Sequence, residues 1–104
     1  MIFETLQSAH EEIELVFLFY ESQRRGLGVE FLDAIEAGYH RILSNPKAWT
    51  VLNSRSKIFR RCMLQRFPYG LIYVIQKEKL IVLAVMHLAR KPGYWLKRFK
   101  SKPE

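Results

Sequence analysis

Two stretches in the first half of the chain place apolar residues at helical spacing. In residues 9–25 the apolar positions recur every three or four residues, and Ser8 followed by Glu11 forms the capping-box pattern that starts many helices. Residues 29–44 repeat this periodicity and end before Pro46, which disfavours helix in the residue before it. Two glycines between the stretches are typical of a tight turn. The pattern therefore predicts an antiparallel helix hairpin.

The first of these helices is apolar on more than one side. Its main stripe, at the spacing of a helix face, consists of Ala9, Ile13, Val16, Phe17 and Tyr20. Leu15, Leu18 and Phe19 fall outside this stripe. We therefore expect these three residues to pack against something beyond the core of the chain itself.

Gly38 lies on the apolar stripe of the second helix, where glycine costs about 1 kcal/mol of helix stability relative to alanine. A residue without a side chain permits a neighbouring element to approach closely. We expect the first helix to cross the second at this point.

The second half of the chain has the pattern of β-strands. Residues 58–65, 69–76 and 80–86 are rich in β-branched and aromatic residues, with turn residues between them, which predicts an antiparallel meander. Residues 1–5 predict at most a short, degenerate fourth strand at one edge, and residues 47–57 have the composition of a polar connector. The 104 residues are thus predicted to form one α+β domain. In it, the N-terminal antiparallel helix hairpin packs on a three- to four-stranded antiparallel sheet, and a short basic C-terminal tail follows.

The predicted sheet is apolar on both faces. In residues 69–76, Ile72 and Val74 alternate with Leu71 and Tyr73. Strict alternation divides the last strand in the same way, with Leu80, Val82, Ala84 and Met86 opposite Ile81, Leu83 and Val85. A sheet with two apolar faces has to be covered on both. The helix hairpin covers one face, and the other requires either the C-terminal segment or a partner.

Charge is distributed unevenly along the chain, whose net charge is +7. Residues 1–40 contain eight of the ten acidic residues and only two of the 17 basic ones, so they carry about −6 and the remainder about +13. A domain polarised in this way attracts an anionic partner, which is either nucleic acid or an acidic protein segment. The alternative is that solvated lysines cluster without a function.

The sequence also indicates the compartment. The single cysteine, Cys62, excludes an internal disulfide, which fits a reducing cytoplasm. The longest apolar stretch, residues 13–20, is interrupted by Glu14 and is too short to span a bilayer. The N-terminus lacks the pattern of a secretory signal. We therefore expect a cytoplasmic protein without a membrane segment.

The sequence contains no motif for a metal site, a phosphate-binding loop or a catalytic nucleophile. The three histidines are too scattered for a metal site, and neither a glycine-rich phosphate loop nor a serine or cysteine nucleophile motif is present, so we expect no metal and no cofactor. What remains is a group of basic and aromatic residues near the predicted strand ends: Arg60, Arg61, Arg66, His87, Arg90, Lys91, Tyr94, Trp95, Lys97 and Arg98. Such residues bind phosphate or carboxylate groups, stack on bases or anchor protein partners. The alternative is that Tyr94 and Trp95 pack the tail onto the sheet while the arginines lie in solvent.

The same residues resemble the RelE/ParE family of toxins from type II toxin–antitoxin systems. The resemblance spans nearly the whole chain, and its most specific parts are residues 66–69, which read RFPY, and residues 87–98, which read HxxRxPxYWxxR. Glu12, Tyr20 and residues 26–28 agree with the front half of the family. The resemblance implies a helix hairpin on a twisted antiparallel sheet. It also implies a co-encoded antitoxin that lays a segment along the toxin surface.

The family has two branches, of which the RelE branch cuts messenger RNA in the ribosome without a metal and the ParE branch inhibits DNA gyrase. In the nuclease branch a catalytic arginine usually follows the tyrosine at the start of the second hairpin strand, and here that residue is Gly70. Met63 and Leu88 replace two further basic residues, whereas Arg61 and Tyr94 match. Loss of such charges removes several kcal/mol of transition-state stabilisation. The resemblance therefore favours the gyrase branch.

Two surfaces follow from these considerations. The target-binding residues are predicted to be Arg61, Arg66, Tyr69, His87, Arg90, Tyr94, Trp95 and Arg98. The antitoxin-binding residues are predicted to be Leu15, Leu18, Phe19, Ile72 and Val74. The alternative to gyrase inhibition is a ribosome-dependent endoribonuclease that acts through Arg61, His87, Arg90 and Tyr94, with the ribosome and messenger RNA as partners. A third possibility is an inactive relic or a binding module, and the assembly is either a homodimer or a toxin–antitoxin hetero-oligomer.

Overall fold

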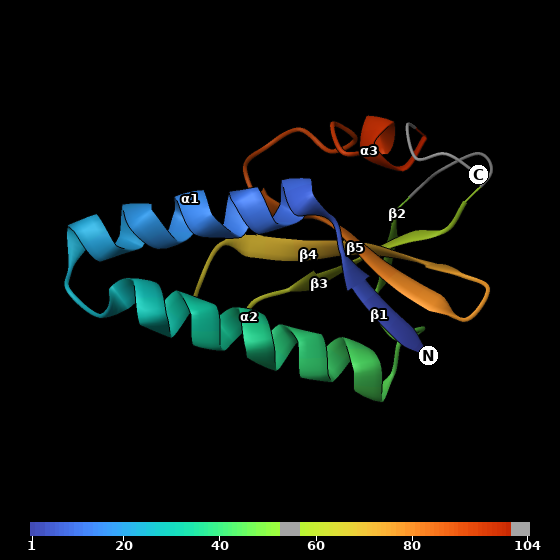
Figure 1. The fold of residues 1–104 in the computed structure, drawn as a ribbon, viewed down its shortest axis with the longest axis horizontal. Helices are drawn as coiled ribbons and strands as arrows, with labels where there is room; N and C mark the ends of the chain where they lie inside the picture. The colour runs from blue at the N-terminus through green and yellow to red at the C-terminus, as the bar shows by residue number, and fades with distance from the viewer. Residues whose placement is uncertain (53–56, 101–104) are drawn as a thin grey trace.

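The computed structural model describes residues 1–52 and 57–100, which form three helices and five strands (Figure 1). In chain order these elements are β1 (Ile2–Thr5), α1 (Gln7–Gln23), α2 (Leu27–Ser44), β2 (Thr50–Leu52), β3 (Phe59–Met63), β4 (Tyr69–Gln76), β5 (Lys79–His87) and α3 (Leu96–Lys100). The antiparallel helix hairpin, the meander of β3, β4 and β5 and the α+β class are all confirmed.

The sheet has five strands in the order β1-β5-β4-β3-β2, and every neighbouring pair is antiparallel except β1 and β5. The prediction of three to four antiparallel strands is therefore corrected at both edges. β1 is an edge strand that runs parallel to β5. At its two ends the backbone N–H groups of Ile2 and Leu6 donate to the backbone oxygens of Glu78 and Val82. β2 lies inside the predicted connector, because three residues are too few to show a strand pattern and only the pairing with β3 defines it.

The predicted start of the first helix is wrong. α1 begins at Gln7, so Ser8 lies inside the helix, and Leu6 at the N-cap makes no side-chain hydrogen bond. β1 ends at Thr5 and leads almost directly into α1, so the backbone bond from Leu6 N–H to Val82 O (3.0 Å) holds the chain where the helix begins. The sheet, and not a capping box, therefore positions the N-terminus of α1.

The turn between α1 and α2 lies two residues earlier than predicted, at residues 24–26, because α1 ends at Gln23 and α2 begins at Leu27. Gly26 adopts the left-handed conformation (φ 89°) that favours glycine. The Glu21 carboxylate accepts hydrogen bonds from the backbone N–H groups of Gly26 and Gly28, both at 2.9 Å. Glu21, near the end of α1, thus satisfies donors at the start of α2 and fixes the angle of the hairpin.

Gly38 permits a close approach, but its neighbour is the sheet and not α1. A Cβ atom at this position would lie 2.7 Å from Leu71 Cδ1 and 3.1 Å from Leu64 Cδ2. Leu71 belongs to β4 and Leu64 follows β3, so the expected crossing by the first helix is wrong. The missing side chain brings α2 down onto the sheet.

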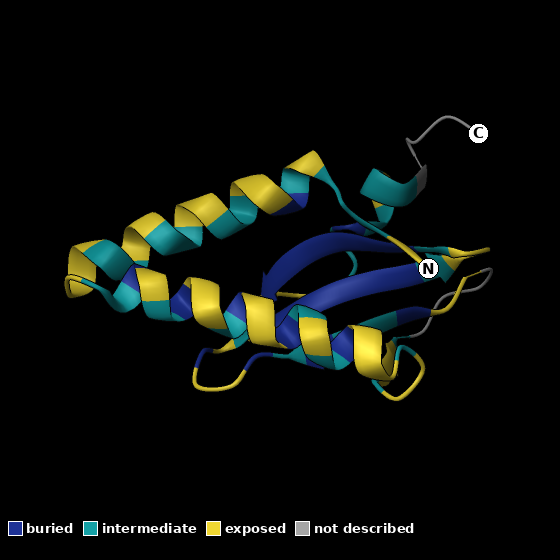
Figure 2. Cartoon of the chain, turned by 60° about the horizontal axis from the view of Figure 1, so that its bottom comes forward, coloured by how far each residue is buried: buried dark blue, intermediate teal, exposed yellow. Residues whose placement is uncertain are grey.

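The sheet separates two apolar layers, and Figure 2 shows its central strands as buried beneath the helices. The layer between the helix hairpin and the sheet includes Phe31, Leu71 and Tyr73. The layer on the other face includes Ile72 and Val74. It is covered by residues 94–99, here called the C-terminal segment, which contribute Trp95, Leu96 and Phe99. Of the two coverings that the sequence left open, the structure contains the chain's own C-terminal segment.

Strict alternation along the last strand is wrong because β5 contains a bulge. Leu83 is an extra residue opposite the step from Ile72 to Tyr73, where the register shifts. Ala84 therefore lies on the same face as Leu83, and Val85 faces the helices. The bulge thus turns the end of β5 so that Val85 lies against the α1 side of the sheet.

The contact at Gly38 yields a stability prediction. The substitution Gly38→Val adds atoms where Leu71 and Leu64 already lie, and overpacking of this kind costs about 1–3 kcal/mol of unfolding free energy. Urea denaturation measures the effect, and Ala37→Val on the exposed side of the same helix is the matched control. Equal denaturation midpoints for the two variants would contradict the packing described here.

Candidate functional site

A single carboxylate joins α1 to the end of the sheet and to the C-terminal segment. Glu12 Oε1 accepts hydrogen bonds from Val85 N–H and Arg98 Nη1, both at 2.9 Å. Glu12 Oε2 accepts from the Tyr94 hydroxyl at 2.9 Å and from Arg98 Nη2 at 2.8 Å. The Glu12 and Arg98 side chains are only 16% and 22% exposed, so this bidentate pair is stronger than a surface ion pair. Glu12 therefore links α1 to the end of β5 and to the C-terminal segment.

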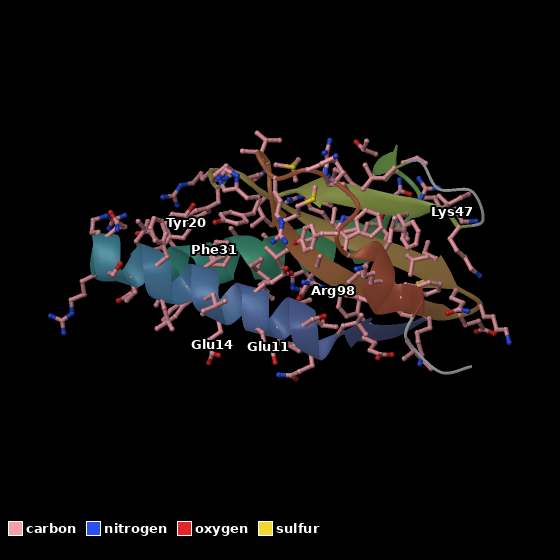
Figure 3. All side chains as sticks on the ribbon, turned by 90° about the horizontal axis from the view of Figure 1, so that it is seen from above. Glu11, Glu14, Tyr20, Phe31, Lys47 and Arg98 are labelled. Carbon is pink, nitrogen blue, oxygen red and sulfur yellow. The ribbon has the colours of Figure 1, made fainter. Side chains whose placement is uncertain are left out.

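Arg98 belongs to α3, and its side chain reaches α1, whereas Glu11 and Glu14 project away from the body of the protein (Figure 3). Besides its two bonds to Glu12, Arg98 Nη1 donates to the backbone oxygen of Leu83 at 3.0 Å. The hydrogen bond to Glu12 raises the pKa of the Arg98 guanidinium. Arg98, predicted to bind the target, thus ties the C-terminal segment to α1 and β5.

Tyr94 is held between this carboxylate and two arginines. The guanidinium carbon of Arg90 lies 3.4 Å from the centroid of the Tyr94 ring, and that of Arg98 lies 5.0 Å from it. Burial, followed by the hydrogen bond to Glu12, raises the pKa of the Tyr94 hydroxyl to about 12. At neutral pH the hydroxyl is therefore protonated, and its proton is directed to Glu12.

A cleft of about 240 Å³ lies beside this cluster, between α1, the first residue of β4 and the last residues of β5. It is lined by Glu12, Leu15, Val16, Tyr69, Val85, His87 and Arg90. The His87 ring packs edge-on against Tyr69 with their centroids 5.0 Å apart, and His87 Nδ1 accepts a hydrogen bond from Ala89 N–H at 2.9 Å. The structure thus brings Tyr69, His87 and Arg90, three of the residues predicted to bind the target, to one opening.

Three predicted site residues lie in the core. Trp95 is 2% exposed and packs against Phe59 with ring centroids 4.8 Å apart, in the layer that also contains Ile72 and Val74. The apolar character that made them candidates for partner contacts is used by the C-terminal segment, which covers this face of the sheet. In this structure none of the three is accessible to a partner.

Arg61 and Arg66, the other two arginines predicted to bind the target, lie away from the cleft. Arg66, in the turn between β3 and β4, donates to Glu30 of α2 at 2.6 Å and is exposed. Arg61 belongs to β3 and pairs in register with Ile72. Neither residue lines the cleft. The predicted target surface is thus divided, with only Tyr69, His87, Arg90, Tyr94 and Arg98 at or beside the cleft.

The Arg61 side chain lies where a side chain at position 70 would be, and Gly70 has none. A Cβ atom on Gly70 would lie 2.8 Å from Arg61 Cγ, 3.1 Å from Arg61 Cδ and 3.0 Å from Met63 Sδ. The Nε atom of Arg61 is buried and has no hydrogen-bond partner among the described residues. Arg61 therefore closes the space beside Gly70 in this chain.

Glu12 is the residue that sequence reasoning missed as part of the site. It lies three residues after Ala9 and four before Val16, so helical spacing alone places it at the edge of the buried stripe. An acidic residue at such a position requires a partner. Its partners lie more than 70 residues away in the sequence, so the signal indicated a buried acid without identifying what it binds.

Within residues 1–52 and 57–100, no cluster of three histidine, cysteine, aspartate or glutamate side chains has the geometry to hold a metal ion. No helix in the described part of the chain is long and apolar enough to cross a membrane.

Two helices on a five-stranded, mostly antiparallel sheet, with a C-terminal segment behind it, make up a RelE/ParE-type α+β fold. A chain of the chromosomal ParDE TA (toxin–antitoxin) system from P. aeruginosa has this fold, with a TM-score of 0.65 over 85% of this chain and 96% of that chain. The two sequences are 11% identical, so the likeness is one of fold. No protein-family model and no curated protein matches the sequence.

The contact between Gly70 and Arg61 yields a test by double-mutant cycle. We expect Gly70→Ala to destabilise the protein by about 1–3 kcal/mol, because the new methyl group overlaps the Arg61 side chain. In an Arg61→Ala background the cost should fall by at least about 1 kcal/mol, because contacting residues are coupled. Urea denaturation of the four proteins gives the coupling. Additive effects would show that Arg61 does not fill the space beside Gly70.

Proposed function

We propose that this chain is the toxin of a type II toxin–antitoxin system. It acts in the cytoplasm, is neutralised by a co-encoded antitoxin and inhibits growth by binding DNA gyrase. The observation that carries the proposal is the RelE/ParE-type fold combined with an open surface around the cleft, where Arg90, His87 and the exposed residues of α1 meet. A basic and aromatic surface of this kind is suited to bind an acidic or phosphate-bearing partner.

The antitoxin accounts for the apolar residues that α1 leaves uncovered. Leu15, Leu18 and Phe19 are 68%, 55% and 55% exposed, on the side of the helix away from its own core. Grouped apolar residues on a protein surface commonly mark a partner interface. The resemblance to the RelE/ParE family supplies the partner, which is the antitoxin that lays a segment along the toxin.

Inhibition by binding is favoured over RNA cleavage because of the arrangement of the residues that a nuclease would use. Gly70 has no side chain, so this position supplies no cation to a scissile phosphate, and the aliphatic part of Arg61 occupies the space beside it. The proton of Tyr94 is directed to Glu12, and its pKa of about 12 makes proton transfer near neutral pH unfavourable. His87 and Arg90 remain accessible, and both are suited to binding contacts.

The proposal is tested by DNA supercoiling with purified gyrase in the presence of this chain. We expect inhibition, and we expect Arg90→Gln to raise the half-inhibitory concentration at least about tenfold, which corresponds to about 1.4 kcal/mol of binding free energy. Lys47→Gln, which changes an exposed base after α2, should leave inhibition unchanged. Undiminished supercoiling at a large excess of the chain would contradict gyrase as the target.

Expression in a bacterial host with a DNA-damage reporter separates the alternatives. Growth arrest with the reporter active supports gyrase inhibition. Arrest with an inactive reporter, together with cleavage of translated messages detected by primer extension, would favour the endoribonuclease. Unaffected growth with soluble protein confirmed would favour the inactive relic or binding module and would contradict the toxin proposal.

A further inference from the structure

The cleft unites two surfaces that the sequence treated separately. Leu15 forms part of its wall and belongs to the apolar group on α1, while Tyr69, His87 and Arg90 belong to the basic and aromatic group at the strand ends. Phe19 lies one helical turn beyond Leu15 and contacts Tyr20, with ring centroids 5.3 Å apart. An apolar wall and a basic rim therefore border the same opening.

The charge that the cleft presents to a ligand is positive, although Glu12 is one of its lining residues. Glu12 is committed to Val85, Tyr94 and Arg98 through four hydrogen bonds. Arg90 is exposed and stacks on the ring of Tyr94, and no ion pair among the described residues includes it. Stacking over the ring leaves the N–H edges of a guanidinium available to a carboxylate, which it binds with two parallel hydrogen bonds.

The size of the cleft indicates the kind of ligand. Its volume of about 240 Å³ is below the range of roughly 300–1,000 Å³ that is usual for small-molecule and cofactor sites. Val16 and Val85 supply apolar lining, and the wall at Leu15 is open to solvent. A cleft of this kind suits one or two side chains of a protein segment, which anchor it in the way that buried interface residues do.

We propose that this cleft receives a segment of the antitoxin in which an apolar side chain is closely followed by a carboxylate. The apolar side chain packs against Leu15, Val16 and Val85, and the carboxylate binds Arg90. The inference rests on the proposed function, because the antitoxin is the partner that covers the exposed apolar residues of α1 in the resting complex. Charge complementarity selects an acidic segment, since Arg90 lies at the cleft without an ion pair to any described residue.

This arrangement makes neutralisation a direct competition. An antitoxin segment that occupies the cleft covers Arg90, His87 and Tyr69, which are the residues assigned to target binding. The antitoxin and the target therefore cannot bind the same copy of the toxin at this surface. No conformational change of the toxin is needed for neutralisation.

The test titrates the isotope-labelled full chain with N-acetyl-phenylalanine and follows its backbone amide signals by NMR. We expect the signals of Val16, Val85 and Ala89 to shift. The probe should bind at least about fivefold more tightly than N-acetyl-phenylalaninamide, which lacks the carboxylate, and than N-acetylglycine, which lacks the ring. Arg90→Gln should remove the advantage over the amide, whereas Lys47→Gln should retain it.

Equal binding of the acid and the amide, shifts confined to other residues, or the absence of binding would each overturn the assignment of the cleft. These outcomes are separate from a failure of the proposed function, which the growth and supercoiling experiments measure without the probe. A chain that arrests growth but does not discriminate between the probes is a toxin whose antitoxin binds elsewhere. A chain that discriminates between the probes but leaves growth and gyrase unaffected has the binding cleft without the toxin activity.

Discussion

The bidentate pair between Glu12 and Arg98 is the interaction on which the functional side of the molecule depends. It connects α1, the end of β5 and the C-terminal segment through one carboxylate that is largely removed from solvent. Hydrogen bonds to a charged group each contribute about 1.5–3 kcal/mol, and a buried charge left unpaired is costly. Replacing one of these partners therefore disturbs the other two segments as well.

The same pair sets the character of the surface around the cleft. Because Glu12 is satisfied internally, it offers no negative charge to a ligand, and the exposed cation of Arg90 determines the local field. Because Arg98 and Glu12 hold Tyr94 in place, its ring provides a fixed platform under Arg90. Positioning a flexible arginine in advance lowers the entropy that binding costs. The stability of the tail and the recognition chemistry are thus two consequences of one contact.

Much of this fold follows from local pattern, and the site follows only in part. Apolar periodicity predicted the helix hairpin and the three long strands, because each of these elements is long enough to repeat its apolar spacing more than once. The pattern did not reveal β2 or the bulge at Leu83, since pairing with a neighbouring strand defines both. Tyr69, His87 and Arg90 were predicted from residue type near strand ends and share the cleft. Glu12 was missed, because its partners lie in distant parts of the chain. Trp95 was assigned to the target surface, and the structure instead matches the alternative in which it packs the tail onto the sheet.

Amide hydrogen exchange of the Glu12→Ala variant tests this account most directly, with Glu14→Ala on the exposed side of the same helix as the control. The account predicts at least about tenfold faster exchange at Val85, Leu96 and Arg98 in the Glu12 variant, which corresponds to about 1.4 kcal/mol of lost local stability. The amides of β4 should keep their protection. Unchanged protection at the three amides would contradict the claim that one carboxylate holds the C-terminal segment and the cleft together.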